Sequence, residues 1–126
     1  MIVLRDSTET LTITLGGTNA HEWHTSYEQF GPGQAGPEPK ANSGTIATTD
    51  QTAICSPGTG GAARIKSIYI RNTTGNTTTV HVESKISSTS RSLTPAISLA
   101  SGEGLGYESG SGWQVYLTNG NRKAAA

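Results

Sequence analysis

The chain has 126 residues, of which 9 are basic and 9 acidic, so its formal net charge is 0. A chain of this length fits one domain and can fold without disulfides or bound metal. Binding to nucleic acid needs a concentrated excess of Lys and Arg, so a neutral chain with 14% charged residues argues against nucleic acid as a partner. The 19 threonines and 14 serines supply much of the polarity and favour a β protein with many short turns.

The cysteine content and the start of the chain bear on the compartment. Cys55 is the one cysteine, so no internal disulfide can form, and we expect a small buried side chain next to Ile54. The sequence contains neither a basic segment followed by an apolar run nor a stretch apolar enough to span a membrane. We therefore expect no signal peptide, no membrane partner and synthesis in a cytoplasm. The final Ala124–Ala126 can be left by cloning and carries no weight in the interpretation.

The first strand signal lies near the start of the chain. Residues 9–15 alternate strictly, with Leu11, Ile13 and Leu15 on one face and three threonines on the other. This is the period-2 pattern of a half-buried strand. The polar residues 6–7 before it permit a turn.

Residues 20–30 hold three of the seven aromatic residues of the chain. Trp23, Thr25 and Tyr27 share one face at strand spacing, so we predict a strand here. A short helix is the alternative, but no apolar helical stripe supports it.

Residues 31–44 contain three of the five prolines and four glycines, which neither a helix nor the interior of a sheet tolerates. We predict a loop here, long for a compact domain and therefore functional, mobile or packed on a neighbouring chain. The loop divides the predicted organisation into an N-terminal strand-bearing arm at 1–30, the loop itself, a β-sandwich domain at 45–120 and a C-terminal tail at 121–126.

The sequence pattern of residues 45–120 predicts short strands separated by turns. Apolar alternation recurs about every 10 to 13 residues, which indicates an antiparallel sandwich or barrel. Ile68 and Ile70 share one face, and Ile65 and Tyr69 share the other, so this strand is predicted to be central. The clearest predicted strands lie within 64–73, 77–84, 91–100, 104–109 and 112–119.

Three patterns that suggest chemistry have simpler explanations. His21 and His24 lie three positions apart, so on a strand they point to opposite faces and cannot chelate one ion. Glu103 and Glu108 lie in or beside turns, without the further pattern of a glycosidase site. The glycine-rich residues 58–61 lack the Lys-Ser/Thr that follows in a phosphate-binding loop. We therefore predict no catalytic residue, no metal site and no cofactor.

Two further patterns are also ambiguous. Asn72 and Asn76 each begin an Asn-X-Thr glycosylation pattern, but without a secretory signal we interpret them as polar turn residues. Six aromatic residues could form a sugar-stacking platform, although core or interface packing is the better interpretation. They are Trp23, Tyr27, Tyr69, Tyr107, Trp113 and Tyr116.

The order of the strand and turn patterns resembles that of a known class of proteins. After the threonine-rich strand near the start, Arg64 to Asn72 matches R-x-x-x-[IV]-x-[IV]-x-N, and a Thr/Val strand follows at Thr77 to Glu83. Leu99 to Tyr107 then matches L-x-x-G-[ED]-x-L-x-Y, and Gly112 to Val115 matches G-[WF]-x-V. This layout resembles small virion structural proteins of tailed bacteriophages. The likeness covers the C-terminal half well, the first strand loosely and the proline-rich middle not at all.

The resemblance implies a jelly-roll-like sandwich, usually trimeric, on the outside of a capsid or on a tail. We therefore expect a non-enzymatic capsid decoration (cement) protein on the virion surface, made in the host bacterial cytoplasm, that binds the major capsid protein or another virion protein. Its N-terminal arm would reach a neighbouring subunit by pairing with an exposed sheet edge. The arm residues predicted to contact the partner are Leu11, Ile13, Trp23, Tyr27 and Phe30.

Two alternatives belong to other functional classes. A receptor- or glycan-binding module of a tail or head fibre would use exposed rings at Trp23, Tyr27 or Trp113. An enzyme such as a glycan hydrolase would need two convergent carboxylates in a cleft, and the sequence favours it least.

Overall fold

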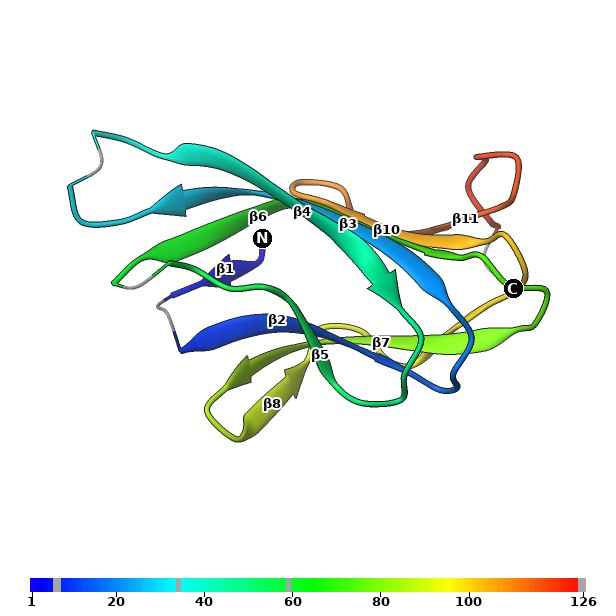
Figure 1. Cartoon of the computed structure of the whole chain (residues 1–126). Helices are drawn as coiled ribbons and strands as arrows, with labels where there is room; N and C mark the ends of the chain where they lie inside the picture. Colours follow the sequence, from blue (N-terminus) through cyan, green and yellow to red (C-terminus); the bar gives the residue numbers. More distant parts are fainter. Residues whose placement is uncertain (6–7, 34, 59, 125–126) are drawn as a thin grey trace.

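The computed structural model describes residues 1–5, 8–33, 35–58 and 60–124, which fold into strands β1 to β11 without a helix. The strands form two antiparallel sheets that pack face to face (Figure 1). The predicted antiparallel β-sandwich is therefore confirmed. The turn predicted at residues 6–7 and the last two alanines lie outside the described residues.

The first sheet, sheet A, has the order β11-β10-β6-β3-β4, and the short strand β1 pairs with β6 beside β10. Its strands are β1 (Val3–Leu4), β3 (His21–Phe30), β4 (Glu38–Ile46), β6 (Ala62–Asn72), β10 (Gly104–Glu108) and β11 (Gly112–Tyr116).

The second sheet, sheet B, has the order β5-β2-β7-β8, and β9 also pairs with β7. Its strands are β2 (Glu9–Leu15), β5 (Thr52–Cys55), β7 (Thr78–Ile86), β8 (Thr89–Ser92) and β9 (Ile97–Leu99).

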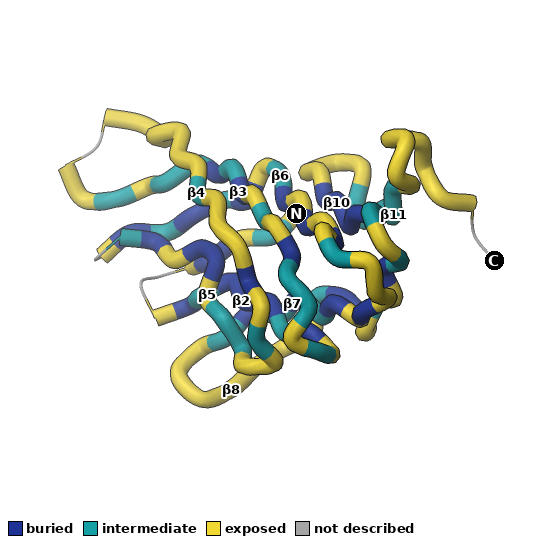
Figure 2. The backbone as a smooth tube through the Cα atoms, turned by 45° about the vertical axis from the view of Figure 1, so that its right-hand side comes forward, coloured by how far each residue is buried: buried dark blue, intermediate teal, exposed yellow. Residues whose placement is uncertain are grey.

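The core lies between the sheets, where the alternating apolar rows of both sheets meet (Figure 2). Sheet B contributes Leu11 and Ile13 from β2 and Val80 and Val82 from β7, all 0% exposed. Each side chain of this size stabilises the fold by roughly 1.5–3 kcal/mol when it leaves water. Sheet A contributes Ile65, Ile68, Ile70 and Leu105.

β6 departs from simple alternation at a β-bulge. The register against β3 shifts after Ser26, and Lys66 has no partner residue on that strand. The bulge turns Ile65 into the core, although strict alternation predicts it on the face of Tyr69. The outer face of β6 is therefore polar apart from Tyr69, and the prediction of two apolar faces is wrong.

The predicted N-terminal arm is also wrong, although the strands predicted within it are present. β2 lies between β5 and β7 in sheet B, and β3 lies between β6 and β4 in sheet A. Residues 1–30 thus supply an interior strand to each sheet, and the sandwich begins at β1 rather than at residue 45. The physical reason is that the apolar row of β2 fills the core of its own chain, so it needs no neighbouring subunit.

The loop predicted at residues 31–44 is present only as far as residue 37. From Glu38 onward the chain forms β4, which pairs with β3 from Glu38↔Gln29 to Ile46↔His21. Pro39 is compatible with this strand because an edge strand leaves one row of N–H groups unpaired. Gly44 is compatible because the indole of Trp23 occupies the space beside it, about 3.0 Å from where a Cβ would lie.

The end of β6 is fixed by the buried side chain of Asn72. Its Nδ2 donates to the carbonyl oxygens of Asn76 (2.7 Å) and Leu99 (3.0 Å). Its Oδ1 accepts from the backbone N–H of Thr74 (3.0 Å) and from the Thr74 hydroxyl (2.8 Å). Asn72 is 0% exposed, so this residue of the first glycosylation pattern is a structural turn residue.

We expect Asn72→Ala to cost about 2–4 kcal/mol of unfolding free energy, because two carbonyl groups, that of Leu99 in a buried contact, lose their donor. Asn76→Ala is the matched control. Asn76 accepts the hydrogen bond from Asn72 with its backbone oxygen, which the substitution keeps, and the residue is exposed. Chemical denaturation of both variants measures the difference. Equal stabilities would show that the side chain of Asn72 does not hold the turn.

His21 is a second buried polar residue, 1% exposed on the inner face of β3. Its Nδ1 lies 2.9 Å from the carbonyl oxygen of Asn19 and donates to it, whereas its Nε2 has no hydrogen-bond partner. Burial lowers the pKa of His21, and the hydrogen bonds to the backbone only partly oppose this effect.

Because the pKa of His21 is lower in the folded chain, the unfolded chain takes up more protons below about pH 6.5. We expect the unfolding free energy to fall as pH drops through this window, by at most about 1.4 kcal/mol per pH unit from this group. Denaturation at about pH 7.5 and about pH 5 measures the change, and His21→Leu should reduce it. The pKa values of Glu28 and Glu103 are lowered from 4.5, so these groups change the unfolding free energy only below that pH and do not contribute to the difference measured here. An undiminished pH dependence in His21→Leu would contradict the assignment.

Candidate functional site

The five residues predicted to contact a partner do not form one surface. Leu11 and Ile13 are 0% exposed and Tyr27 is 6% exposed, so all three belong to the core. Trp23 is half-buried and packs against the core. Phe30, at the end of β3, is the exposed member of the five, and the guanidinium carbon of Arg64 lies 5.6 Å from the centre of its ring.

The residues weighed as ligands or catalysts do not converge either. His21 faces the core and His24 is exposed on the opposite face of β3, as their spacing predicts. Glu103 precedes β10 and Glu108 ends it, so extended backbone separates them by about 16 Å, too far for a glycosidase pair. Within the described residues, no group of three or more His, Cys, Asp or Glu side chains could hold a metal ion. The same residues include no helix long and apolar enough to cross a membrane.

Two of these groups have clear structural roles. Glu103 accepts from the backbone N–H of Ala100 (2.8 Å) and pairs with Lys123. The hydrogen bond from Ala100 has the largest effect and lowers the pKa of Glu103. Lys123 lowers it further, whereas burial acts in the opposite direction. Cys55 is 2% exposed, as predicted, and burial raises the pKa of its thiol to about 12. The thiol is therefore neutral near pH 7 and is a poor nucleophile.

One cluster on sheet B has the residue types of a catalytic triad. Ser92 Oγ lies 2.8 Å from His81 Nε2, and His81 Nδ1 lies 3.6 Å from Glu83 Oε1. The second distance is too long for the hydrogen bond that orients a catalytic histidine. The same Oε1 already accepts from Thr14 Oγ1 and from Gln51 Nε2, at 3.4 Å each. The geometry is that of cross-strand polar contacts between β2, β7 and β8.

We predict that a fluorophosphonate probe for serine hydrolases leaves the protein unlabelled, because His81 is not oriented to activate Ser92. Mass spectrometry after incubation with the probe tests this. Labelling at Ser92 that disappears in His81→Ala would contradict the prediction. Phe30→Ala would serve as the control, since Phe30 lies on sheet A, away from this cluster.

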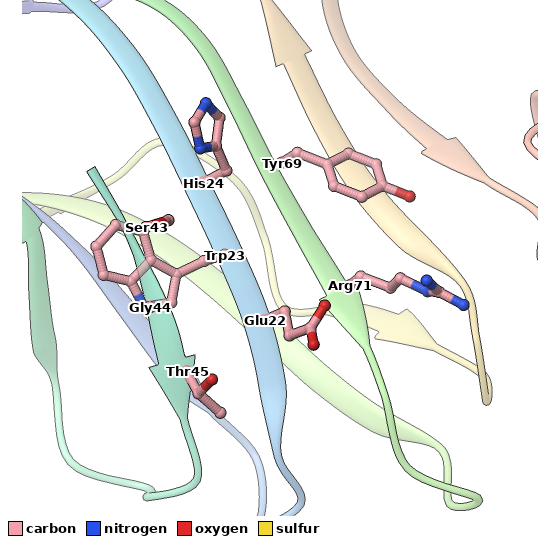
Figure 3. Close-up of a pocket in the computed structure, with 8 residues that line it drawn as sticks. All are labelled: Glu22, Trp23, His24, Ser43, Gly44, Thr45, Tyr69 and Arg71. Atoms are coloured by element: carbon pink, nitrogen blue, oxygen red, sulfur yellow. The ribbon is translucent and has the colours of Figure 1, made fainter. Parts of the chain in front are cut away.

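The outer face of sheet A carries two shallow hollows on either side of Tyr69. The first lies over β3, β4 and β6 (Figure 3). Its lining residues are Glu22, Trp23, His24, Ser43, Gly44, Thr45, Tyr69 and Arg71. The second lies over β6, β10 and β11 and includes Tyr69, Gly106, Glu108 and Tyr116.

Glycines form the floor under the two tyrosines. A Cβ at Gly104 would lie 2.5 Å from the hydroxyl oxygen of Tyr69, and a Cβ at Gly106 would lie 2.7 Å from Cε2 of Tyr116. The absence of side chains at Gly104 and Gly106 thus lets both rings lie against the backbone of β10. The ring centroids of Tyr69 and Tyr116 are 6.3 Å apart, with the planes tilted by 56°.

Apart from Glu108 in the second hollow, the charged residues of this face fall into two groups. At one end, Glu28 binds Arg64 (2.8 Å) and Lys66 (2.9 Å), and hydrogen bonds from Lys66 and then Arg64 lower its pKa. Beside the first hollow, Glu22 and Arg71 lie on paired positions of β3 and β6. Neither makes an ion pair or a side-chain hydrogen bond with another described residue. Their charges remain available to a ligand.

No family model matches the chain, and neither a curated protein nor a solved structure matches it. The site therefore has to be judged from its own geometry.

Sequence reasoning placed Tyr69 and Tyr116 among possible stacking residues but favoured Trp23, Tyr27 and Trp113. Trp113 is half-buried, and its ring lies 5.0 Å from that of Tyr107. The glycines at alternate positions 104 and 106, next to an alternating strand, were the signal for a clear outer face. Which side chains lie over these glycines depends on the strands that pair with β10, and the sequence alone does not show that pairing.

Proposed function

We propose that this chain is a non-enzymatic structural protein of a tailed-phage virion that binds the assembled head as a decoration protein. Two observations support the proposal. The ordered strand and turn patterns of the C-terminal half resemble those of small virion proteins, and β4 leaves one long strand edge open. The second observation carries the proposal, because it supplies a surface for subunit contact after the loss of the predicted arm.

β4 has few of the features that protect sheet edges. Its nine residues pair with β3 on one side, and among the described residues no strand pairs with the other side. Natural edges are blocked by charges, prolines, bulges or short length. Here the charges and the proline lie at Glu38, Pro39 and Lys40, and residues 41–46 carry none.

The other sheet edges are short or covered. The C-terminal segment lies along β11, where Lys123 donates its backbone N–H to the carbonyl of Val115 (2.8 Å) and Arg122 bridges Tyr116. In sheet B, β5 and β8 have four residues each. The open edge of β4 is therefore the longest that the described chain offers to a partner.

An extended segment of a virion protein can add to β4 as a further strand, so that main-chain hydrogen bonds supply affinity. Many copies of the head protein on a symmetric lattice would add avidity to a modest single contact. The sandwich keeps its own β2 and β3, and the partner contributes the added strand. The predicted arm would instead have added a strand of this chain to the sheet of its neighbour. The trimeric state implied by the resemblance stays a prediction.

Undecorated heads of the cognate phage test the proposal. We expect the purified protein to sediment with them in a saturable manner and to raise the temperature at which they release DNA. Successive residues of an edge strand point their N–H groups alternately to the neighbour and outward. One of Lys40→Pro and Ala41→Pro therefore removes an outward donor and leaves the β3–β4 bonds intact.

The folded member of this pair should bind heads at least about tenfold more weakly. Arg91→Ala, on β8 of the opposite sheet, is the control and should bind normally. Absence of binding by the wild-type protein would overturn the proposal. Unchanged binding by the folded proline variant would exclude β4 as the contact.

A further inference from the structure

We propose that the outer face of sheet A is a saccharide-binding surface that holds a neutral pyranose chain across Tyr69 and Tyr116. This surface, the tyrosine face, comprises these two rings together with Glu22, His24 and Arg71. The inference does not depend on head binding, because it concerns the face of the sheet, whereas head binding was assigned to its edge.

The first step of the argument concerns the two rings. Tyr69 is 41% exposed and Tyr116 is partly exposed, and both rest against the glycines of β10. The hydroxyl end of the Tyr69 ring meets Gly104, and one edge of the Tyr116 ring meets Gly106, so β10 holds both rings while part of each stays exposed to solvent. Exposed aromatic rings fixed in this way present flat apolar surfaces, against which the C–H faces of pyranose rings can stack.

The hydroxyl groups distinguish these tyrosines from the structural ones. Tyr107 accepts a hydrogen bond from the backbone N–H of Ile2 (3.1 Å), and Tyr27 accepts one from Asn42 Nδ2 (3.4 Å). Among the described residues, the hydroxyl groups of Tyr69 and Tyr116 have no such partner. Their polar ends are therefore open to a ligand.

The polar groups around the rings suit hydroxyl ligands. Glu22 can accept from two sugar hydroxyls and Arg71 can donate to others, since neither is paired within the described chain. Figure 3 shows Tyr69 and Arg71 extending from β6 on the same side, with Glu22 and His24 beside them on β3. The two hollows are lined by the carboxylates of Glu22 and Glu108 and by the guanidinium of Arg71, so the face has no excess of positive charge. This balance disfavours a polyanion and suits a neutral ligand.

The shape of the face favours a chain over an enclosed small molecule. The two hollows share Tyr69 and together extend over β4, β3, β6, β10 and β11. A ligand bound there remains open to solvent at both ends, as an internal segment of a polysaccharide requires. A peptide would need either a deeper apolar groove or a strand edge, and the tyrosine face offers neither.

Binding is tested with neutral oligosaccharides as probes, namely maltohexaose, cellohexaose, xylohexaose and mannohexaose, followed by calorimetry or by chemical-shift titration of the full chain. We expect saturable binding of at least one probe. Tyr69→Ala and Tyr116→Ala should each weaken it by about tenfold or more. Tyr69→Phe and Tyr116→Phe keep the stacking surface and should retain most of the affinity.

Two further variants make the test specific. Gly106→Val places a side chain where the ring of Tyr116 lies and should weaken binding while every ligand-contacting group remains. Phe30→Ala is the matched control, because it removes an exposed ring at the far end of β3 and should bind like the wild type. Circular dichroism confirms that each variant is folded.

Three outcomes would overturn the inference. They are absence of binding by all four probes, binding that neither tyrosine-to-alanine variant weakens, and binding that Phe30→Ala weakens as strongly as Tyr69→Ala. Head binding is measured on the same variants. Because Tyr69→Ala leaves the edge of β4 unchanged, loss of saccharide binding with normal head binding would separate the two proposals.

Discussion

Sheet A depends on β6, the one strand of this sheet, as described, that pairs with three others. Its eleven residues pair with β3 along one side and with β10 and β1 along the other. The inner row of β6 places three isoleucines in the core, and its outer row carries Tyr69 and Arg71. The stability of the sandwich and the composition of the tyrosine face therefore rest on the same strand. A change in the register of β6 would move both rows at once.

The C-terminal end of β6 is held by polar groups. At its C-terminal end, the side chain of Asn72 bonds to the turn that leads into β7 and to the carbonyl of Leu99 in β9. The backbone N–H of Asn72 also donates to the carbonyl of Glu103, before β10. Asn72 thus connects two segments that cross between the sheets, one from β6 to β7 and the other from β9 to β10. Such a network costs little when every donor and acceptor is satisfied and much when one is removed.

Protection of the sheet edges explains where a partner can bind. The C-terminal segment lies along β11, and the terminal strands of sheet B are short, whereas β4 is long and uncharged over most of its length. An edge of this kind favours assembly because it leaves backbone donors and acceptors unpaired. The tyrosine face lies on the adjacent surface and is polar and shallow. The two proposed contacts, with a phage head and with a saccharide, therefore use different surfaces of one small domain.

Periodicity accounts for what the sequence predicted correctly. The alternation in residues 9–15 identified Leu11 and Ile13 as an apolar row, and the row is buried. The spacing of His21 and His24 correctly separated them onto opposite faces. Composition misled at residues 38–44, because Pro39 and Gly44 are tolerated on an edge strand beside Trp23. Alternation also misled at Ile65, because a bulge is a property of two paired strands and not of one.

The sequence by itself determined most of the strands and their inward rows, with β4 and Ile65 as exceptions, and the polar, weakly charged surface. These features depend on residues close together in the chain. The tertiary structure decided that residues 1–30 are interior strands, that β4 is the open edge, and that Tyr69 lies beside Tyr116. These features depend on which distant segments pair. Strand pairing is set by burial and hydrogen bonding summed over the whole sandwich, so no local pattern specifies it.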